Sequence, residues 1–527
     1  MAETSLGRLQ KQVDTLSKKV VRLQDNLEYQ KEEKRKIQRE YDKLKNEFED
    51  IVKKVVTKAV NEVKKEYEEI IKQKDQRIFE LECRLNINSD TSSLPSSKNP
   101  LDKPKTEIQN SREKTNRSKG GQKNHPKHKL PKFKDEEITK VIPHTPKTCP
   151  YCNSDNLTII DIAQRDVLDF EIIIKKERNE FATCKCNKCG KVTKEKIPEN
   201  MHAENQYGNG VKTFLISLYN YGFVSYNRCR HLIYGLTNGE INPSEGYMVK
   251  IQKKAGIKLK NFVFDVSEML KQSKLLHWDD TVVRIGEKEK ACFRAYTDKM
   301  FVLFKAHMAK NTEGMDEDGI LQNLTSNTIV MHDHLLHNYC DDYSYQNAEC
   351  NAHVARKLKG ITINTKHKWS DDMQKLLLTT LAKRNEYISK KIMSFEPKEL
   401  KKILDEYDKI VNVGFIEYKE FKHKYEFENE ENLLEFFRDY KDNITFWMRD
   451  FSVPYSNNLV ESLLRMIKTK MKISMQFQTL EHARYFANIR SYVETCGNFG
   501  ISKTVALNRL FDGEPYSVQE LLQLKNS

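Results

Sequence analysis

The sequence predicts a multidomain α+β protein, and three observations lead to this prediction. The chain opens with proline-free heptads, continues into a segment with two C-x-x-C motifs, and then combines short apolar strands with long charged helices. At 527 residues it is too long for one hydrophobic core, so three or more folded units are expected. The net charge of +14 favours a polyanionic partner such as nucleic acid; a basic protein without such a partner is the alternative.

The sequence also bears on the compartment of the protein. No apolar stretch is long enough to span a bilayer, and the first residues lack the apolar centre of a signal peptide. We therefore expect a cytoplasmic protein with no membrane partner. In that compartment the 11 cysteines indicate metal ligands or inert thiols rather than disulfides.

Residues 1–88 are predicted to form a coiled coil. Residues 6–85 contain no proline and only one glycine, Gly7. Apolar residues recur in alternating steps of three and four, at Leu6, Leu9, Val13, Leu16, Val20, Leu23 and Leu27, and a similar seam resumes at Ile37. A long helix packed on its own protein is the alternative, but the heavily charged flanks favour self-association.

Residues 89–135 are predicted to be a basic flexible linker. Positions 97–134 contain 12 Lys and Arg against three Asp and Glu, and they lack the apolar residues needed for a core. Such a segment can lie along DNA phosphates and release counterions, or it can simply be a solvated linker.

Residues 136–200 are predicted to form a small zinc ribbon. Two C-x-x-C motifs flank a strand-like segment, so that two thiolate pairs can reach one tetrahedral ion. The expected Zn²⁺ ligands are Cys149, Cys152, Cys186 and Cys189. Four protein ligands leave no open position, so the metal would be structural. Cys184 is a rival ligand, although its spacing to Cys186 is short.

Residues 201–272 are predicted to be helical. Ser244 suits the N-cap of a lysine-rich helix, and the helix before it ends near Gly235. This region therefore fits either a helix-turn-helix that binds DNA or a plain helical connector.

Residues 273–365 and 452–478 are predicted to form an α/β core. Three strand-like segments, "LLHWDDTVVRI", "KACFRAYTD" and "KMFVLFKAHM", precede a short helix and a fourth strand, "NTIVMHDHLL". That order is expected of a ribonuclease-H-like core, in which the first and fourth strands are neighbours. Asp279 on the first strand and Asp333 at the end of the fourth could then face each other, and Mg²⁺ between them would relieve their repulsion.

A third oxygen ligand is expected from a later helix. The stretch "YSNNLVESLLRMIKTKMKIS" places Glu461, Arg465 and Lys468 on one helix face. Taken alone, Glu461 and Arg465 would more simply form an i,i+4 ion pair. Between the two parts of the core, residues 366–451 are predicted to be a helical insertion, and residues 479–527 should be C-terminal helices.

Several of these segments together resemble the transposases of the insertion sequence 66 family. "HWDDTVVRI" is similar to the family's A-D-E-T-P-V segment and "ECNAHVARKL" to its C-x-A-H-x-x-R segment. "YSNNLVESLLRMIKTKMKIS" is similar to D-N-N-x-x-E-x-x-x-R-x-x-K-x-x-x-K-I-S, and "GGQKNHPKHKL" to a G-G-Q-x-G-H linker. The resemblance covers nearly the whole chain.

The resemblance implies a DDE-type DNA transposase. Asp279, Asp333 and Glu461 would be the catalytic residues and hold two Mg²⁺ ions. The implied DNA-binding residues are His353, Arg356, Arg465, Lys468 and Lys472. Asp280 would pair with a nearby base such as Lys468 or Arg465. The partners implied are double-stranded DNA, as terminal inverted repeats and target, a homo-oligomer through the coiled coil, and accessory proteins; the setting is the nucleoid.

The sequence also departs from the family pattern. Ser456 replaces the usual Asp, Val282 the usual Pro, Met475 the usual Gly and Gln478 the usual Arg, and no Gly follows Asp333. None of these changes removes a predicted metal ligand. A catalytically inactive DNA-binding or regulatory protein derived from a transposase is therefore the alternative function.

Overall fold

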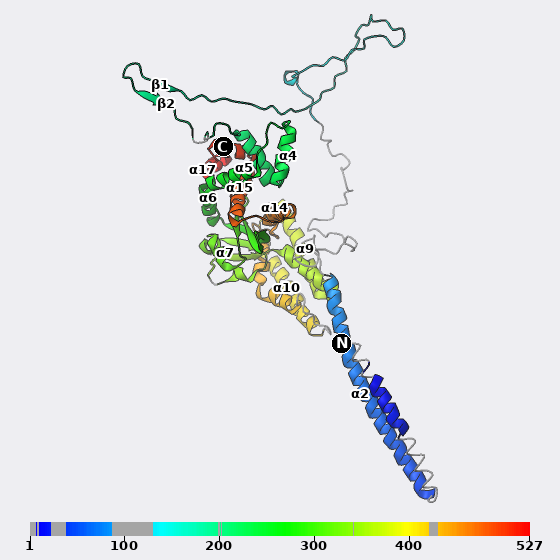
Figure 1. Ribbon diagram of the computed structural model, residues 1–527. Helices are drawn as coiled ribbons and strands as arrows, with labels where there is room; N and C mark the ends of the chain where they lie inside the picture. Colours follow the sequence, from blue (N-terminus) through cyan, green and yellow to red (C-terminus); the bar gives the residue numbers. More distant parts are fainter. Residues whose placement is uncertain are drawn as a thin grey trace. The chain divides into compact units, whose positions relative to one another are not determined.

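The computed structural model describes residues 7, 10–22, 38–86, 130–198, 201, 203–340, 342–420 and 430–526 (Figure 1). The chain divides into two units, residues 1–108 with 348–456 and residues 109–347 with 457–527. Most of the predicted linker, and the heptads at 23–37, lie outside the described residues. No described helix is long and apolar enough to cross a bilayer.

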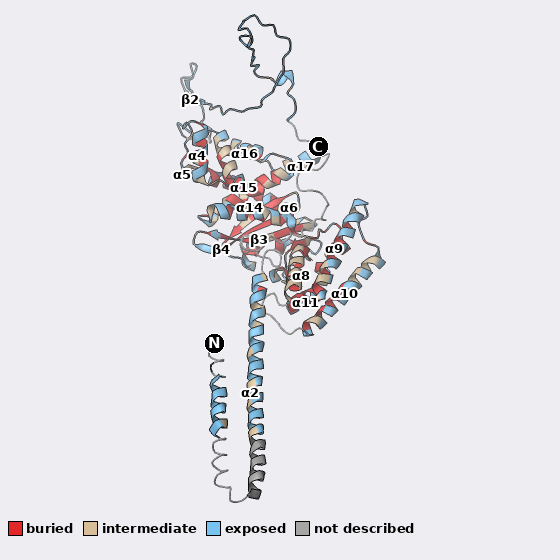
Figure 2. Cartoon of the chain, turned by 90° about the vertical axis from the view of Figure 1, so that its right-hand side faces the viewer, coloured by how far each residue is buried: buried red, intermediate tan, exposed pale blue. Residues whose placement is uncertain are grey.

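The first unit is mainly helical. Residues 10–22 are helical, and the 49-residue helix α2 spans Gln38–Asn86. Most side chains described on α2 are exposed, including the apolar Ile78 and Leu81 within the predicted coiled coil (Figure 2). The end of α2 meets helix α8 (Asn351–Thr365), where Asn86 Nδ2 donates to Asn364 Oδ1 at 2.8 Å. The heptad pattern is thus helical where described.

The remaining helices of this unit form a separate core. They are α9 (Lys368–Ser389), α10 (Pro397–Glu420), α11 (Glu430–Asp439), α12 (Lys441–Ile444) and α13 (Phe446–Arg449). A Cβ atom on Gly414 of α10 would lie 2.5 Å from Leu434 and 2.9 Å from Trp369, so only glycine allows the three helices to approach this closely. The second segment of this unit begins at Ala348 and so includes α8, ahead of the predicted insertion boundary at 366.

The second unit is centred on a five-stranded sheet of order β5-β4-β3-β6-β7. Strands β3 (Leu275–Ile285), β4 (Lys288–Thr297) and β5 (Val302–His307) pair antiparallel, and β6 (Ile329–His332) runs parallel to β3. Helix α7 (Thr312–Glu317) lies between β5 and β6 in the chain. The boundary between the two units falls within β7 (Gln346–Glu349), after its second residue. The predicted neighbourhood of the first and fourth strands is confirmed.

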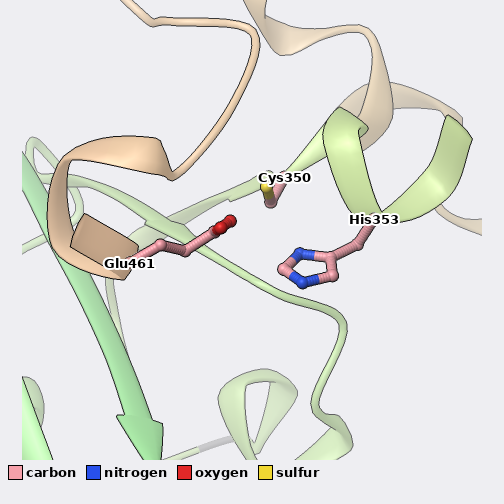
Figure 3. Close-up of side chains that lie close together, drawn as sticks. All are labelled: Cys350, His353 and Glu461. Carbon is pink, nitrogen blue, oxygen red and sulfur yellow. The ribbon is translucent and has the colours of Figure 1, made fainter. Parts of the chain in front are cut away.

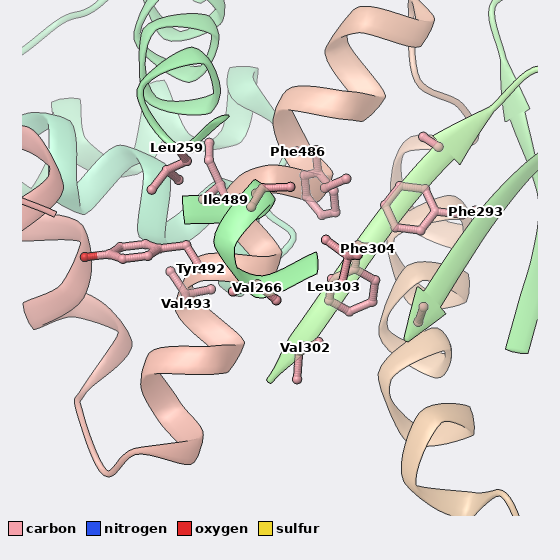
Figure 4. Packing of buried hydrophobic residues seen from close by; sticks show 14 of the residues in the cluster. Leu259, Val266, Phe293, Val302, Leu303, Phe304, Phe486, Ile489, Tyr492 and Val493 are labelled. Carbon is pink, nitrogen blue, oxygen red and sulfur yellow. The ribbon is translucent and has the colours of Figure 1, made fainter. Parts of the chain in front are cut away.

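Helix α15 (Leu480–Asn498) covers one face of this sheet and also completes its edge. Phe293 packs against Phe304 and against Phe486 of α15 in the core drawn in Figure 4. Ser491 Oγ accepts from the Phe304 N–H at 2.8 Å, and Thr495 Oγ1 accepts from the Val302 N–H at 3.0 Å. Two outer backbone donors of the edge strand β5 are therefore satisfied, which limits unwanted strand pairing there.

Helices precede and follow the strands of the sheet along the chain of the second unit. Ahead of the sheet are α3 (Asn209–Ile216), the π-helical turn η3 (Ser217–Tyr221), α4 (Tyr226–Leu236), α5 (Glu245–Lys258) and α6 (Lys260–Lys271). After it come α14 (Asn458–Ser474), α15, α16 (Lys503–Asp512) and α17 (Val518–Asn526). A hairpin of β1 (Thr183–Lys185) and β2 (Val192–Lys194) is the only regular sheet in the described part of the predicted zinc ribbon.

Candidate active site

The two predicted catalytic aspartates lie on neighbouring parallel strands. The β3–β6 register pairs Leu275 with Ile329 and His277 with Met331. Continuing that register by two residues brings Asp333, just after β6, level with Asp279 on β3. The alternation of β-strand side chains puts Asp279 on the sheet face of His277, and Asp280 on the opposite face. Only one of the adjacent carboxylates therefore faces the side that α14 covers.

Helix α14 is fixed to that face by its N-cap residue. Asn457 is buried; its Nδ2 donates to the Trp278 carbonyl at 2.9 Å, and its Oδ1 lies 3.0 Å from His277 Nδ1. Burial lowers the pKa of His277 to about 4, so its ring is neutral at pH 7. Glu461 follows one turn later, where its N–H donates to the Asn457 carbonyl at 3.2 Å. These bonds set the position of Glu461 relative to β3.

The three predicted catalytic carboxylates interact electrostatically. The pKa of Asp279 lies well above its ordinary value, first because the group is buried and then because Asp333 and Asp280 repel its charge. Glu461 raises the pKa further, whereas the Asp280 N–H, which donates to Asp279 Oδ1 at 2.7 Å, lowers it. A cation among these oxygens would remove the repulsion, and carboxylates are ligands that Mg²⁺ accepts.

The predicted partner of Asp280 was wrong. Its Oδ1 lies 2.6 Å from Nζ of Lys310, which follows β5, while Arg465 lies 3.6 Å from Glu461. The Asp280 side chain is 6% exposed and that of Lys310 is 40% exposed. Lys310 was not predicted from the sequence, because it lies in a loop and no local sequence pattern predicts where a loop runs.

A buried network holds the loop that carries Lys310. Arg294, opposite Asp280 on β4, is fully buried and lies 3.5 Å from Asp318. Tyr296 donates to the same carboxylate at 2.7 Å, and His307 also contacts it. The Arg294 guanidinium donates further to the carbonyls of Ala309, Asn311 and Gly314. These bonds brace both ends of the segment 309–318.

The basic residues predicted on α14 lie on its exposed face. Arg465, Lys468 and Lys472 are exposed, whereas Lys470 is buried. The Lys470 ammonium lies 4.4 Å from the centre of the Tyr219 ring and 2.9 Å from Ser474 Oγ. The helix thus presents a basic stripe to solvent and one lysine to the core.

The predicted DNA-binding residues His353 and Arg356 belong to the first unit. Cys350 is buried just ahead of α8, and the His353 N–H donates to its carbonyl at 3.1 Å. Asn351 fixes the start of α8, since its N–H donates to the Tyr455 carbonyl at 3.0 Å. Figure 3 shows Cys350 and His353 at the start of α8, and Glu461 in the first turn of α14.

Each C-x-x-C motif forms a tight turn. The Asn153 N–H donates to the Cys149 carbonyl at 2.9 Å, and the Gly190 N–H donates to the Cys186 carbonyl at 2.8 Å. Backbone N–H groups within each turn lower the pKa of Cys149 and of Cys186. Among the described residues, the four thiols are not gathered into one metal-sized cluster, and Cys184 lies in β1.

Comparison with known proteins identifies the family. The chain matches the family described as "Transposase IS66 family" over residues 206–485, which include all three carboxylates, α8 and the whole of α14. Searches of curated proteins and of solved structures found no match. The match covers more than half of the chain, and it includes the strands and helices that bring the acidic residues together; the protein therefore belongs to the IS66 family of transposases.

Proposed function

We propose that this transposase binds the terminal inverted repeats of its element and catalyses metal-dependent DNA strand cleavage and strand transfer. The observation that carries the proposal is the convergence of Asp279, Asp333 and Glu461 from β3, the end of β6 and the first turn of α14. Family membership supports DNA processing and the use of a divalent metal.

The carboxylates suit two Mg²⁺ ions. All three ligands are hard oxygen donors; burial first and then the charges of neighbouring carboxylates raise the pKa of Asp279, and a bound cation would offset those charges. Bound Mg²⁺ would activate the attacking oxygen and stabilise the leaving oxygen of an in-line displacement at phosphorus. The protein's own part is positional: Asn457 holds the start of α14 against β3, so that Glu461 stays in reach of the strand residues.

Basic side chains on α14 would hold the DNA. The exposed Arg465, Lys468 and Lys472 suit contacts with phosphates, which position a duplex without reading its sequence. We extend the same role to His353 and Arg356 from their motif alone.

Two further proposals concern the N-terminal part. Backbone donors at Cys149 and Cys186 favour thiolates, which supports one structural Zn²⁺ bound by these residues with Cys152 and Cys189. The exposed apolar seam of α2 supports a homo-oligomer through the coiled coil. Zinc analysis of the protein with and without Cys149→Ser, and light scattering of the protein with and without residues 1–88, test these two proposals.

The catalytic proposal is tested by strand transfer on DNA that carries the element's own ends, with Mg²⁺ present. Asp279→Asn and Glu461→Gln should each lower cleavage and joining by more than about 100-fold while duplex binding persists. The matched control is Asp265→Asn, which changes an exposed carboxylate on α6 and should retain activity. Equal activity of all four proteins would refute the assignment of the carboxylates.

One observation favours the alternative of an inactive DNA-binding protein. Met475, where the family usually has Gly, ends α14 with a φ of 61°. That region of backbone space suits glycine and strains a methionine. Binding of the ends without Mg²⁺-dependent cleavage, together with cleavage restored by Met475→Gly, would mark this chain as a decayed copy.

A further inference from the structure

Helix α5 is buried on one face only. Met248, Ile251 and Ala255 are buried, and a Cβ atom on Gly256 would lie 2.6 Å from Tyr485 of α15. Asn488 of α15 also donates to the Gly256 carbonyl at 3.0 Å. This close contact fixes the rotation of α5, and the opposite face is left to solvent.

That opposite face carries lysines without acidic partners. Lys250, Lys253 and Lys254 are exposed on this face and make no ion pair with any residue the structure describes, and neither does the exposed Lys258 at the edge of the buried face. The charge of Lys254 also reaches Lys212 of α3, whose pKa is lowered first by burial and then by that charge. The one acidic residue of α5, Glu245, accepts from Asn227 instead. Positive charges that lie close together without acidic partners favour the binding of a polyanion from outside the protein.

The same helix is poorly suited to reading bases. Gln252 is its one amide side chain; it is fully buried, and its Oε1 accepts from Asn220 at 3.1 Å. The helix contains no Arg or Asn, and a lysine lacks the rigid planar fork with which arginine pairs with guanine, so the exposed face is less suited to recognising base edges by paired hydrogen bonds. Ammonium groups on flexible stems act as point charges, which suits phosphates.

Contacts within the second unit connect α5 to the helix that carries Glu461. Lys470 of α14 packs on the ring of Tyr219, and Tyr219 stacks on Tyr226 of α4 with ring centres 4.1 Å apart. The next residue, Asn227, donates to Glu245 at the start of α5 at 3.1 Å. A duplex held on α5 would therefore be held by the same packed unit that holds the carboxylates.

We propose that the exposed face of α5, formed by Lys250, Lys253 and Lys254, binds the phosphate backbone of double-stranded DNA without sequence preference. This inference rests on the proposed function and deepens it, because it separates duplex holding on α5 from base recognition elsewhere in the chain. Each lysine that contacts a phosphate releases counterions, so binding by this face must weaken steeply with salt.

The test measures duplex binding by the full chain over a range of salt concentrations, with one duplex that carries the element's end and one scrambled duplex. A triple change of Lys250, Lys253 and Lys254 to Gln should weaken binding to both duplexes by the same factor. The slope of log K against log salt should fall by about 2 to 3, and the preference for the end should stay the same. The corresponding triple change to Arg should restore binding.

The matched control changes three exposed lysines of α10, Lys398, Lys401 and Lys402, to Gln and so alters net charge equally. Equal effects of the two Gln triples would overturn the inference, as would loss of end preference with an unchanged salt slope. Wild type that binds neither duplex would count against the proposed function itself. If wild type binds DNA and the variant with Lys250, Lys253 and Lys254 changed to Gln binds equally well, the result would count against this inference alone.

Discussion

Replacing Lys310 by methionine tests whether the ion pair with Asp280 stabilises the carboxylate site. The change removes the ammonium 2.6 Å from Asp280 and leaves the methylene stem. Asp280 would then remain almost fully buried near Asp333 and Asp279, and burial already raises its pKa. In contrast, Asp280→Asn leaves a lysine that is 40% exposed and can turn to water. The two single changes should therefore have unequal costs.

The magnitude follows from the burial of the two groups. Breaking a fully buried pair costs about 3–5 kcal/mol, and an exposed pair contributes about 0–1 kcal/mol. Because Lys310 is partly exposed, we expect about 2 kcal/mol for Lys310→Met and less than about 1 kcal/mol for Asp280→Asn. For a unit of this size, 2 kcal/mol corresponds to a fall in Tm of about 4–8 °C.

The assay is thermal unfolding of wild type, both single variants and the double variant. The double variant should melt close to Asp280→Asn, since the methionine no longer faces an unpaired charge. Lys290→Met is the control, because it removes an exposed lysine of β4 that has no ion pair among the described residues. Strictly additive losses, or a larger loss for Asp280→Asn than for Lys310→Met, would refute the reasoning.

Three further changes test other parts of the second unit. Burial lowers the pKa of Lys470 to about 8, so between pH 8 and 10.5 the unfolded chain binds more protons at this lysine than the folded chain does. Stability therefore rises with pH in that range, and the Tm of wild type should increase relative to the Tm of Lys470→Met. Met475→Gly should raise stability by about 1 kcal/mol in chemical denaturation, because it relieves a positive φ, and a loss of stability would count against strain there. Asn457→Ala should lower strand cleavage by on the order of 100-fold by releasing α14 from β3, whereas Asn458→Ala, at an exposed position, should not.

The sequence supported the strand order and two of the acidic positions. Apolar β-branched segments separated by turns fixed the order of β3 to β6, and neighbouring first and fourth strands place Asp279 beside Asp333. Helical periodicity likewise put Arg465, Lys468 and Lys472 on one exposed face. Both patterns are local, with periods of 2 and 3.6 residues, so they can be recognised without knowing what the segments contact.

Which charges meet was decided only by the tertiary structure. Lys310 pairs with Asp280 because the buried Arg294 and Asp318 fold the 309–318 loop back over the sheet, and no periodicity predicts that path. Likewise, Asn457 docks α14 across a long stretch of intervening chain. The sequence by itself determined the secondary-structure pattern and indicated the candidate carboxylates, because these depend on neighbouring residues. The ion pairs and the burial of single groups depend on distances between remote segments, which only packing sets.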